Sequence, residues 1–491
     1  MRTMISRLRL AHPVRRRYRS DRMESATSTP PDRKTLEALL PRYDMAGPRY
    51  TSYPTAPSWQ EELTADEYRR VLGSLTEAES SPYAVYVHVP FCRKLCHFCA
   101  CNRVVTQKPE LPVQYLQTLG TELQEVRSAL PGSGKAGQFH LGGGTPTHLS
   151  PNQLEELMSA VFASFPPSET PEISIEIDPR VTLDAHMDVL EATGFNRISM
   201  GIQDFDPRVQ EAIHRKQTVS EVAHLVERAR MGGNCGINFD LIYGLPHQTE
   251  QSFSRTLQQV IDLAPDRIAL YGYAHVTWVA KQQRGFERID LPSPLARLSL
   301  LILAIESLTR AGYISIGMDH FALPDDDLAR AIPESRLHRN FMGYTTSPCG
   351  ELLAFGPSGI SELSSGFVQS QRNLKDWQES VADQGLAPFR GHHSSPEDKR
   401  RAWVISQIMC QGELRASAFS ARFGREFLSH FSSELEHLKA FEADGLLDLE
   451  ADGSFRMTPA GRILVRNAAM LFDAYLPKQK NQGGRLFSRT V

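Results

Sequence analysis

Four cysteines, Cys92, Cys96, Cys99 and Cys101, lie within ten residues of one another. Thiolates spaced as in C-x3-C-x2-C can surround one small cage, and iron–sulfur clusters are held by such thiolates, commonly four of them. The chain has seven cysteines in all, and their clustering in a large chain indicates metal binding in a reducing compartment rather than a disulfide framework. Structural zinc is the alternative, with Cys101 as a fourth ligand, although such sites prefer paired C-x2-C elements. The spacing therefore favours iron–sulfur without excluding zinc.

The bulk properties narrow the class of protein further. A length of 491 residues predicts two or more domains. The formal net charge of −3 provides no global basic field for nucleic-acid binding. No apolar run is long enough to span a bilayer, and the basic N-terminus is not followed by a clean apolar stretch of the secretory kind. We therefore predict a cytoplasmic protein that binds neither nucleic acid nor membrane.

The elements that must position the cysteines form a repeating pattern. Six β-rich runs are predicted at Tyr83–Val89, Gln138–Gly142, Glu172–Ile177, Arg197–Ile202, Ile237–Tyr243 and Arg267–Ala274. Amphipathic helical stretches lie between them, at Val113–Leu130, Pro151–Phe165, Val219–Met231 and Thr249–Leu263. Alternation of this kind predicts an α/β fold with a parallel sheet, and six units without a Rossmann glycine fingerprint favour a partial (β/α)6 barrel. In such barrels the chemistry gathers at the C-terminal ends of the strands.

Several strand ends carry residues suited to binding. Gly142, Gly143 and Gly144 follow the second strand, where bare backbone allows a ligand to approach closely. Glu176 ends the third strand and Asp240 lies in the fifth, and an acid at a strand end is often functional. The alternatives are an ordinary turn for the glycines and exposed or ion-paired carboxylates for the acids.

The flanks of the barrel region differ from it in composition. Residues 1–35 are rich in arginine and then in Ser, Thr and Pro, which predicts a disordered basic tail, with a targeting or anion-binding arm as the alternative. An N-terminal arm is expected over 36–82, the barrel over 83–375, and a mostly helical C-terminal domain over 376–491. That last domain has helical patterns at 398–411, 426–444 and 460–476 and a hairpin at 447–457, so a winged-helix arrangement is one option. Its balanced charge favours a lid or packing role over DNA binding.

The segment from Tyr86 to Cys101, directly after the first strand, resembles the signature of the radical S-adenosylmethionine superfamily. Within it, the chain is similar to the oxygen-independent coproporphyrinogen III oxidases of haem biosynthesis. Further matching segments are Gly47–Ala56, Asp319-His320-Phe321 and His338-Arg339-Asn340-Phe341. The chain departs from the family pattern at Met342, where Gln is expected, and at Glu351 and Pro357.

The resemblance implies that Cys92, Cys96 and Cys99 hold a [4Fe–4S] cluster whose fourth iron is open to S-adenosylmethionine. It gives Cys101 and Tyr86 catalytic roles, Cys101 without being a cluster ligand. The cofactor contacts that it implies are Tyr86, Phe98, Gly143, Gly144, Thr145, Glu176, Gln203, Arg215, Asp240, Ala274 and Ile360.

The implied reaction converts two propionates of coproporphyrinogen III into vinyl groups and consumes two S-adenosylmethionine molecules per turnover. By this resemblance, the reduced cluster splits each cofactor into methionine and a 5′-deoxyadenosyl radical. The radical takes a hydrogen from the propionate, carbon dioxide leaves, and one electron goes to an acceptor. The resemblance also implies a reduced flavodoxin- or ferredoxin-type electron donor and a monomer. Charged side chains hold carboxylates best, so the candidates for the propionates are Arg49, Lys94, His338 and Arg339, with plain surface positions as the alternative. For His88, His97, His275 and His320 we expect buried polar contacts rather than tuning of the cluster.

Two other classes of protein remain open at this point. A haem-binding, chaperone-like paralog would share the cluster, but Cys101 and the Gly47–Ala56 segment favour the enzyme. A zinc-stabilised interaction or DNA-binding protein would be colourless, whereas an iron–sulfur protein is coloured.

Overall fold

The computed structural model describes residues 33–75, 82–233, 235–286, 290–346, 349–477 and 487–490. Most of the predicted basic tail, residues 1–32, lies outside this part of the chain. The six predicted strands are all present: β2 (Tyr83–Val89), β5 (Ala136–Gly143), β6 (Pro167–Ile177), β7 (Arg197–Gln203), β8 (Gly236–Tyr243) and β9 (Arg267–Gly272). The predicted helices correspond to α5 (Glu110–Ala129), α6 (Pro151–Ser164), α9 (Val219–Met231) and α10 (Glu250–Leu263).

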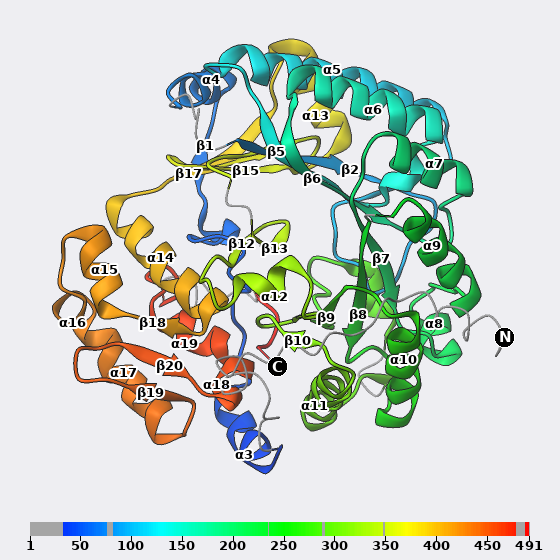
Figure 1. Cartoon of the computed structure of the whole chain (residues 1–491). Coiled ribbons are helices and arrows are strands. Elements are labelled where there is room, and N and C mark those ends of the chain that lie inside the picture. Colours follow the sequence, from blue (N-terminus) through cyan, green and yellow to red (C-terminus); the bar gives the residue numbers. More distant parts are fainter. Residues whose placement is uncertain are drawn as a thin grey trace.

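Thirteen of the described strands form one curved, open sheet (Figure 1). Its centre is parallel in the order β14-β2-β5-β6-β7-β8-β9, and its two ends are antiparallel. The added strands are β1 (Glu61–Glu62), β10 (Ile314–Ser315), β11 (His320–Ala322), β14 (Leu352–Phe355), β15 (Ile360–Leu363), β16 (Gly366–Ser370) and β17 (Pro388–His393). The sheet does not close on itself, which confirms the partial barrel.

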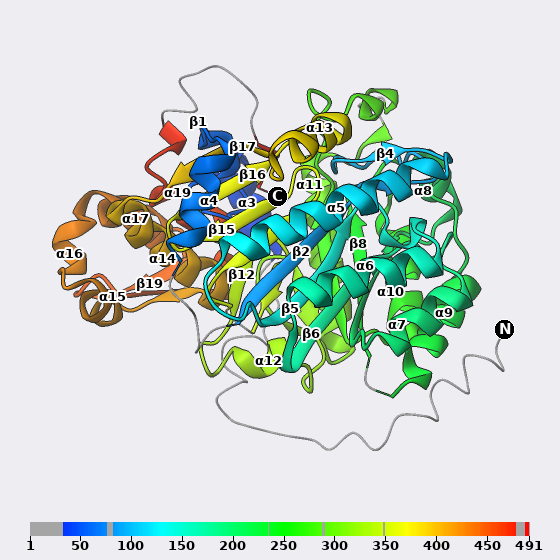
Figure 2. The same cartoon turned by 90° about the horizontal axis from the view of Figure 1, so that it is seen from above.

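Helices cover the outer face of this sheet, and α5, α6, α7 (Asp184–Ala192), α9 and α10 lie side by side there (Figure 2). Side-chain capping fixes where several of them begin. The Ser150, Thr218 and Thr249 side chains accept hydrogen bonds from the first turns of α6, α9 and α10. The other helices of this region are α8 (Pro207–Ala212), α11 (Pro294–Arg310), α12 (Asp327–Ala331) and α13 (Leu374–Gln384).

The parallel strands alternate between apolar residues that face the helices and polar residues that face the inside of the barrel. In β8, Ile237, Phe239 and Leu241 belong to the main core, whereas Asn238 and Asp240 line an internal cavity. Side chains alternate faces along a strand, so the same pattern in neighbouring strands produces a polar interior. His140 of β5, Ser174 and Glu176 of β6 and Ser199 of β7 also line that cavity.

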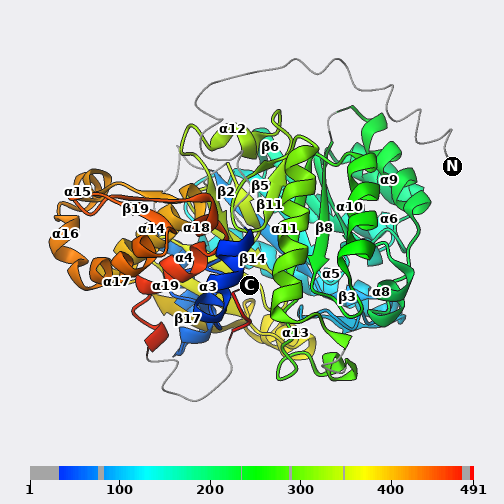
Figure 3. The same ribbon diagram turned by 90° about the horizontal axis from the view of Figure 1, so that it is seen from below.

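The C-terminal region packs as a group of helices beside the open sheet (Figure 3). Its elements are α14 (Pro396–Gln411), α15 (Ala416–Phe423), α16 (Phe427–His430), α17 (Ser432–Ala443), α18 (Pro459–Ile463) and α19 (Val465–Leu471), with strands β18 (Glu413–Leu414), β19 (Leu447–Leu449) and β20 (Phe455–Met457). The predicted hairpin is present as β19 and β20. The helices predicted at 426–444 and 460–476 are each divided into two. Phe431 leaves helical geometry at φ −116°, which allows both Phe427 and Phe431 to be buried completely.

The N-terminal arm joins the two regions. Helix α3 (Arg33–Tyr43) contributes Leu36 and Leu40 to a core shared with α11 and the C-terminal helices. Helix α4 (Ala65–Gly73) packs near α5, and β1 pairs with β17, so the sheet continues past residue 375. The division of the chain at residues 35, 82 and 375 stays a prediction. No helix in the described ranges is long and apolar enough to cross a membrane.

Glu122, a buried carboxyl group on α5, ties two later segments to the sheet. It accepts hydrogen bonds from the Gly356 amide at 2.8 Å and from Trp377 Nε1 at 3.1 Å. Burial raises the pKa of Glu122 to about 7, and the two donors oppose that rise. The loop after β14 and helix α13 are therefore both anchored on one side chain.

We predict that Trp377→Phe destabilises the protein, because it leaves a buried oxygen of Glu122 without its donor. The cost should be about 1–3 kcal/mol, measured as a lower midpoint of urea unfolding. Trp278→Phe is the matched control, since Trp278 is 38% exposed, and it should leave the midpoint unchanged. Equal midpoints for the two variants would contradict this role of Glu122.

Candidate functional site

The cysteine loop follows β2 and opens onto a cavity of about 830 Å³ at the C-terminal ends of the parallel strands. Short strands β3 (Phe91–Cys92) and β4 (Val104–Val105) pair at the two ends of the loop. The predicted site residues that line this cavity are Cys92, Cys96, Phe98, Cys99, Cys101, Gly143, Gly144, Thr145, Glu176, Gln203, Arg215 and Asp240. These residues come from strands β3, β5, β6, β7 and β8, from the cysteine loop, and from the segments that follow β5 and α8. They meet at a single cavity at the strand ends.

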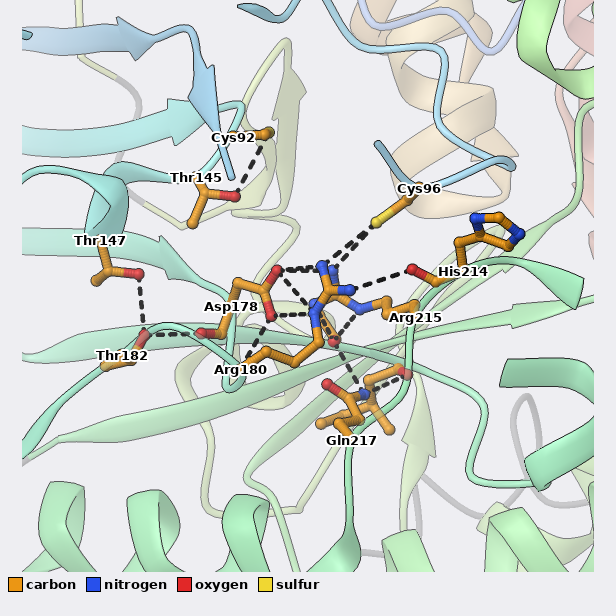
Figure 4. A network of polar contacts seen from close by, with 12 residues as sticks. Cys92, Cys96, Thr145, Thr147, Asp178, Arg180, Thr182, His214, Arg215 and Gln217 are labelled. Atoms are coloured by element: carbon orange, nitrogen blue, oxygen red, sulfur yellow. Dashed lines mark hydrogen bonds and ion pairs between the residues drawn. The ribbon is translucent and has the colours of Figure 1, made fainter. Parts of the chain in front are cut away.

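Two arginines lie against Cys96 (Figure 4). Arg180 Nη2 is 3.4 Å from the Cys96 sulfur, and Arg215 Nη1 is 3.7 Å from it. Both guanidinium groups also bind Asp178, at 2.6 Å and 3.0 Å. Burial alone would raise the pKa of Asp178, but the charges of Arg215 and Arg180 outweigh it and lower the pKa to about 2. Two guanidinium groups that share one ionised carboxylate therefore face the sulfur.

Gly143, the last residue of β5, and the following Gly144 lie very close to neighbouring side-chain and backbone groups. Gly143 has φ +115°, and a Cβ there would lie 2.7 Å from the His88 ring. A Cβ on Gly144 would lie 2.7 Å from the Phe91 carbonyl oxygen. Glycine is therefore required at both positions, and it leaves bare backbone facing the cavity.

Two carboxyl groups in the cavity differ in protonation. Burial would raise the pKa of Glu176, but hydrogen bonds from His140 and from the Gly143 amide keep it below its ordinary value. Burial and the negative charge of Glu176 raise the pKa of Asp240 to about 7, against hydrogen bonds from Ser199 and Asn238. The pair thus provides one ionised acceptor beside a carboxyl group that titrates near neutral pH.

A chain of hydrogen bonds orients Tyr86. His88 Nε2 lies 2.9 Å from the Asn102 carbonyl oxygen, which can only accept, so this nitrogen carries the proton. Burial lowers the pKa of His88 and keeps the ring neutral. Its Nδ1 therefore accepts from the Tyr86 hydroxyl at 3.1 Å. Tyr86 thus donates its hydroxyl proton to His88, and the hydroxyl oxygen can still accept a hydrogen bond.

Comparisons with known proteins identify the family of this chain. A model of the radical SAM superfamily matches residues 86–260, and a model of the HemN C-terminal domain matches residues 394–464. The chain is 43% identical over 455 residues to an oxygen-independent coproporphyrinogen III oxidase of Pseudomonas aeruginosa, covering 92% of this chain and 98% of that protein. The chain belongs to the oxygen-independent coproporphyrinogen III oxidase family.

Other relatives agree with this assignment. The family member of Escherichia coli is 41% identical over 455 residues, with the same coverage of 92% and 98%. The solved structure of the E. coli coproporphyrinogen III oxidase, described as a radical SAM enzyme, superposes with a TM-score of 0.84. It has 40% identity to this chain and covers 87% of this chain and 97% of its own. The predicted fold class and family resemblance are therefore confirmed.

The residues of this oxidase-family site fit an iron–sulfur cluster. Burial raises the pKa of the Cys92 thiol to about 11, so a thiolate there requires strong positive charge beside it, which iron supplies. No three His, Cys, Asp or Glu side chains in the described ranges are placed to bind one metal ion. A cluster puts a separate iron at each thiolate and so separates its ligands more widely than zinc does. Cys92, Cys96 and Cys99 would hold such a cluster, with Arg180 and Arg215 beside it.

Three predicted contacts of the family lie close to the cavity without being among its lining residues. Tyr86 stacks on His140 with ring centroids 5.8 Å apart. The Ala274 and Phe98 carbonyl oxygens accept from the same amide nitrogen of Gln283, at 3.1 Å and 2.7 Å. Ile360 is the first residue of β15. Ser358, two residues before it, accepts a hydrogen bond from the Asn102 side chain at 3.0 Å.

The other residues singled out from the sequence fall into two groups. His88, His275 and His320 make hydrogen bonds to protein groups, and the His97 ring stacks on that of His214 with centroids 3.7 Å apart. Of the propionate candidates, Lys94 lines the cavity and His338 is exposed on β12 (His338–Asn340), whereas Arg49 and Arg339 lie deeper. Strand β12 pairs with β13 (Gly343–Thr345) outside the main sheet.

Three residues of the site were not predicted from the sequence. Asp178 and Arg180 follow the end of β6 in Ile-Asp-Pro-Arg, where the strand-end rule could have identified the acid. His140 lies two residues before Gly142, so it shares the inward face of β5 with the glycine turn. No local pattern shows that these side chains meet the cysteines and Glu176.

We predict that Asp178→Asn destabilises the site, because it leaves two buried guanidinium groups without their carboxylate. Removing one partner of a buried pair costs about 3–5 kcal/mol, which should lower the urea midpoint and the iron and acid-labile sulfide content after reconstitution. Asp188→Asn is the control, since Asp188 pairs with Arg228 at the surface and such pairs contribute about 0–1 kcal/mol. An Asp178→Asn protein with normal midpoint and iron content would contradict the role of this carboxylate.

Proposed function

We propose that this protein catalyses the oxygen-independent oxidative decarboxylation of two propionates of coproporphyrinogen III, which gives protoporphyrinogen IX. The observation that carries the proposal is the single cavity in which the four thiols of the cysteine loop, the glycine turn and the carboxyl groups of Glu176 and Asp240 meet. When bound, the cluster and S-adenosylmethionine would supply a radical that removes a hydrogen atom from the substrate, and the one electron left when carbon dioxide departs would pass to an electron acceptor. Two cofactor molecules are used per turnover, one for each propionate.

The chain's own residues bind and orient the cofactor in this proposal. The exposed backbone of Gly143 and Gly144 pairs with the amino-acid end, and the ionised Glu176 accepts hydrogen bonds from it. Asp240 and Gln203 lie on neighbouring strands and contact the nucleoside end. The Tyr86 oxygen, whose proton is committed to His88, accepts from the cofactor. Cys101 lies beside Cys99 and acts without ligating iron.

Two arginines beyond β9 are suited to hold the substrate carboxylates: the buried Arg339 and the partly buried Arg49. Arg49, from the N-terminal arm, donates to Asp319 and to the Gly272 carbonyl oxygen, both at 3.1 Å. Arg339 Nη2 lies 4.0 Å from the same Asp319, and Arg339 Nε is buried without a hydrogen-bond partner in the described structure. Two cations thus share one carboxylate. The excess positive charge and the unpaired donor favour an incoming carboxylate group.

The location of the protein, its oligomeric state and its electron donor are also proposed. We infer a cytoplasmic monomer that takes electrons from a reduced flavodoxin- or ferredoxin-type protein. The N-terminal arm and the C-terminal helices cover the mouth of the barrel and keep water from the reacting groups.

An anaerobic assay of the reconstituted protein with dithionite, S-adenosylmethionine and coproporphyrinogen III tests the proposed reaction. We expect about two 5′-deoxyadenosines per protoporphyrinogen, one for each carboxylate lost. Cys96→Ala should abolish both products and lower the iron content. Cys101→Ser should keep the iron and lose the porphyrin product, whereas Cys235→Ala, outside the loop, should keep both.

Other outcomes of this assay separate the alternatives. Cleavage of S-adenosylmethionine without porphyrin product, together with tight haem binding, would replace the proposal with the haem-binding paralog. A colourless zinc protein that cleaves no cofactor would contradict it altogether.

We predict that Arg339→Gln raises the KM for coproporphyrinogen III about tenfold or more, because a charged hydrogen bond to a carboxylate is lost. Cofactor cleavage without substrate should stay at the wild-type rate. Arg336→Gln is the control, since Arg336 is exposed and paired with Glu334. An unchanged KM in Arg339→Gln would remove this arginine from the substrate site.

A further inference from the structure

Gln283, in the short 3₁₀ helix η3 (Lys281–Gly285), is completely buried beside the cysteine loop. Its side-chain Nε2 donates to the Phe98 carbonyl oxygen at 2.7 Å and to the Ala274 carbonyl oxygen at 3.1 Å. Its Oε1 accepts from the Val276 amide at 2.6 Å. One side-chain amide thus connects the cysteine loop to the segment after β9, across 185 residues of sequence.

The three partners determine the orientation of this amide. A carbonyl oxygen can only accept a hydrogen bond and a backbone amide can only donate one. Nε2 must therefore face Phe98 and Ala274, and Oε1 must face Val276. Both protons of the Nε2 group are used within the protein, so a rotation of the Gln283 side chain would leave buried polar groups without partners.

Two turns between β9 and η3 bring Gln283 back to these partners. The Ala280 amide donates to the Val276 carbonyl oxygen at 2.8 Å, and the Gln283 amide donates to the Ala280 carbonyl oxygen at 3.0 Å. Strand β9 ends at Gly272, so Ala274 lies beyond the strand. The Gln283 side chain holds the Ala274 carbonyl group in place of a strand neighbour.

The cysteine loop is held on two sides around Phe98. The Gln282 side chain donates to the Cys99 carbonyl oxygen, so consecutive side chains of η3 bind consecutive carbonyl groups of the loop. On the other side, the His97 amide donates to the carbonyl oxygen of Ile213, the residue after α8, at 3.0 Å. The backbone of Phe98 is thus fixed between α8 and η3.

Phe98 and Ala274 lie toward the nucleoside end of the proposed cofactor site. The sheet runs in the order β5-β6-β7-β8-β9. The proposed contacts to the amino-acid end come from β5 and β6, and those to the nucleoside end come from β7 and β8, so the end of β9 is next in this order. Phe98 and Ile242 line the cavity and pack in an apolar cluster with Tyr273 and Phe286. An apolar wall of this kind suits the flat ring of a purine.

We propose that Gln283 is a positioning residue that holds the cysteine loop and the end of β9 at the spacing that receives the adenine base of S-adenosylmethionine. This inference rests on the proposed function, in which Phe98 and Ala274 contact that cofactor. The cysteines hold the cluster at the amino-acid end of the cofactor, and Gln283 fixes the two backbone segments at its other end. Without this amide, the two segments lose the side chain that they share.

Two variants test this role through the Kd of S-adenosylmethionine, measured by anaerobic equilibrium dialysis of the reconstituted protein. Gln283→Met keeps the side-chain length and removes all three hydrogen bonds, so the Kd should rise about tenfold or more. Gln283→Glu can still accept from the Val276 amide but cannot donate to both carbonyl oxygens, so its Kd should rise as well. Both variants should keep the wild-type iron and sulfide content. Wild-type affinity in either variant, or loss of the cluster in both, would overturn the proposal.

Asn196, at the opposite end of the strands, provides a control for an amide with a purely structural role. Its side chain accepts from the Ile173 amide at 2.9 Å and donates to the Pro171 carbonyl oxygen at 2.8 Å. Asn196→Leu should lower the urea midpoint, as Gln283→Met does, and leave the Kd unchanged. A similar rise of the Kd in Asn196→Leu would show that the Kd follows stability alone, which would overturn the proposal.

EPR of the reduced cluster separates the two ends of the cofactor site. S-adenosylhomocysteine is the probe, because it keeps the amino-acid group and the adenine base but has no sulfonium to cleave. At saturating S-adenosylhomocysteine, the signal of Gln283→Met should match that of the wild type, since the amino-acid end still meets an unchanged cluster. A different signal would place the effect at the cluster and overturn the proposal.

Hydrogen exchange, followed by mass spectrometry of the reconstituted protein without cofactor, tests the connection itself. In Gln283→Met, peptides that contain residues 96–101 and 273–280 should exchange faster together, whereas in Asn196→Leu both should exchange as in the wild type. Unchanged exchange in Gln283→Met would overturn the proposal. If the wild-type protein does not bind S-adenosylmethionine, the proposed function fails instead, while hydrogen exchange still decides whether Gln283 holds the two segments together.

Discussion

Asp178, directly after β6, is buried together with two guanidinium groups. Three parts of the site are held together through its carboxylate. Arg180 comes from the same strand end, and Arg215 comes from the link between α8 and α9. Arg215 also donates to the Gly201 carbonyl oxygen of β7 and lies against the Cys96 sulfur. A buried charge is tolerated only when it is paired, so these segments must stay together. The cysteine loop is thereby held over the strand ends.

The polar interior of the barrel follows from the alternation of residues in its strands. Each strand sends apolar side chains outward to the helices and polar ones inward, so the inner cavity contains groups that must bond to one another. Glu172 with Arg197, His140 with Ser174, and Asp240 with Ser199 satisfy this need across neighbouring strands. Buried polar groups cost little once they are paired. The same groups that keep the interior stable therefore also fix the orientation of Glu176.

The N-terminal arm is held in place through its backbone carbonyl groups as well as by carboxylates such as Asp444 and Asp473. The Arg466 guanidinium, on α19, donates to the carbonyl oxygens of Gly47, Pro48 and Arg489. Burial lowers the pKa of Arg466 to about 9, yet the carbonyl oxygens satisfy its donors. Arg49 extends from this anchored segment to Asp319. The C-terminal helices thus determine the position of the arm and therefore that of Arg49.

The sequence by itself determined the parallel strands, the order of strand and helix, and the cysteine loop, because periodicity and motif spacing are local properties. Glu176, Gln203 and Asp240 could be placed at strand ends for the same reason. The later strands β14 to β17 were not predicted, because short buried strands carry little periodic signal. Only the tertiary structure decided which charges meet. Asp178 and Arg215 are 37 residues apart, and His140 and Glu176 lie on different strands, so their pairing depends on register and burial. Protonation follows from those contacts, since it is set by the partners and the loss of water rather than by the residue type alone.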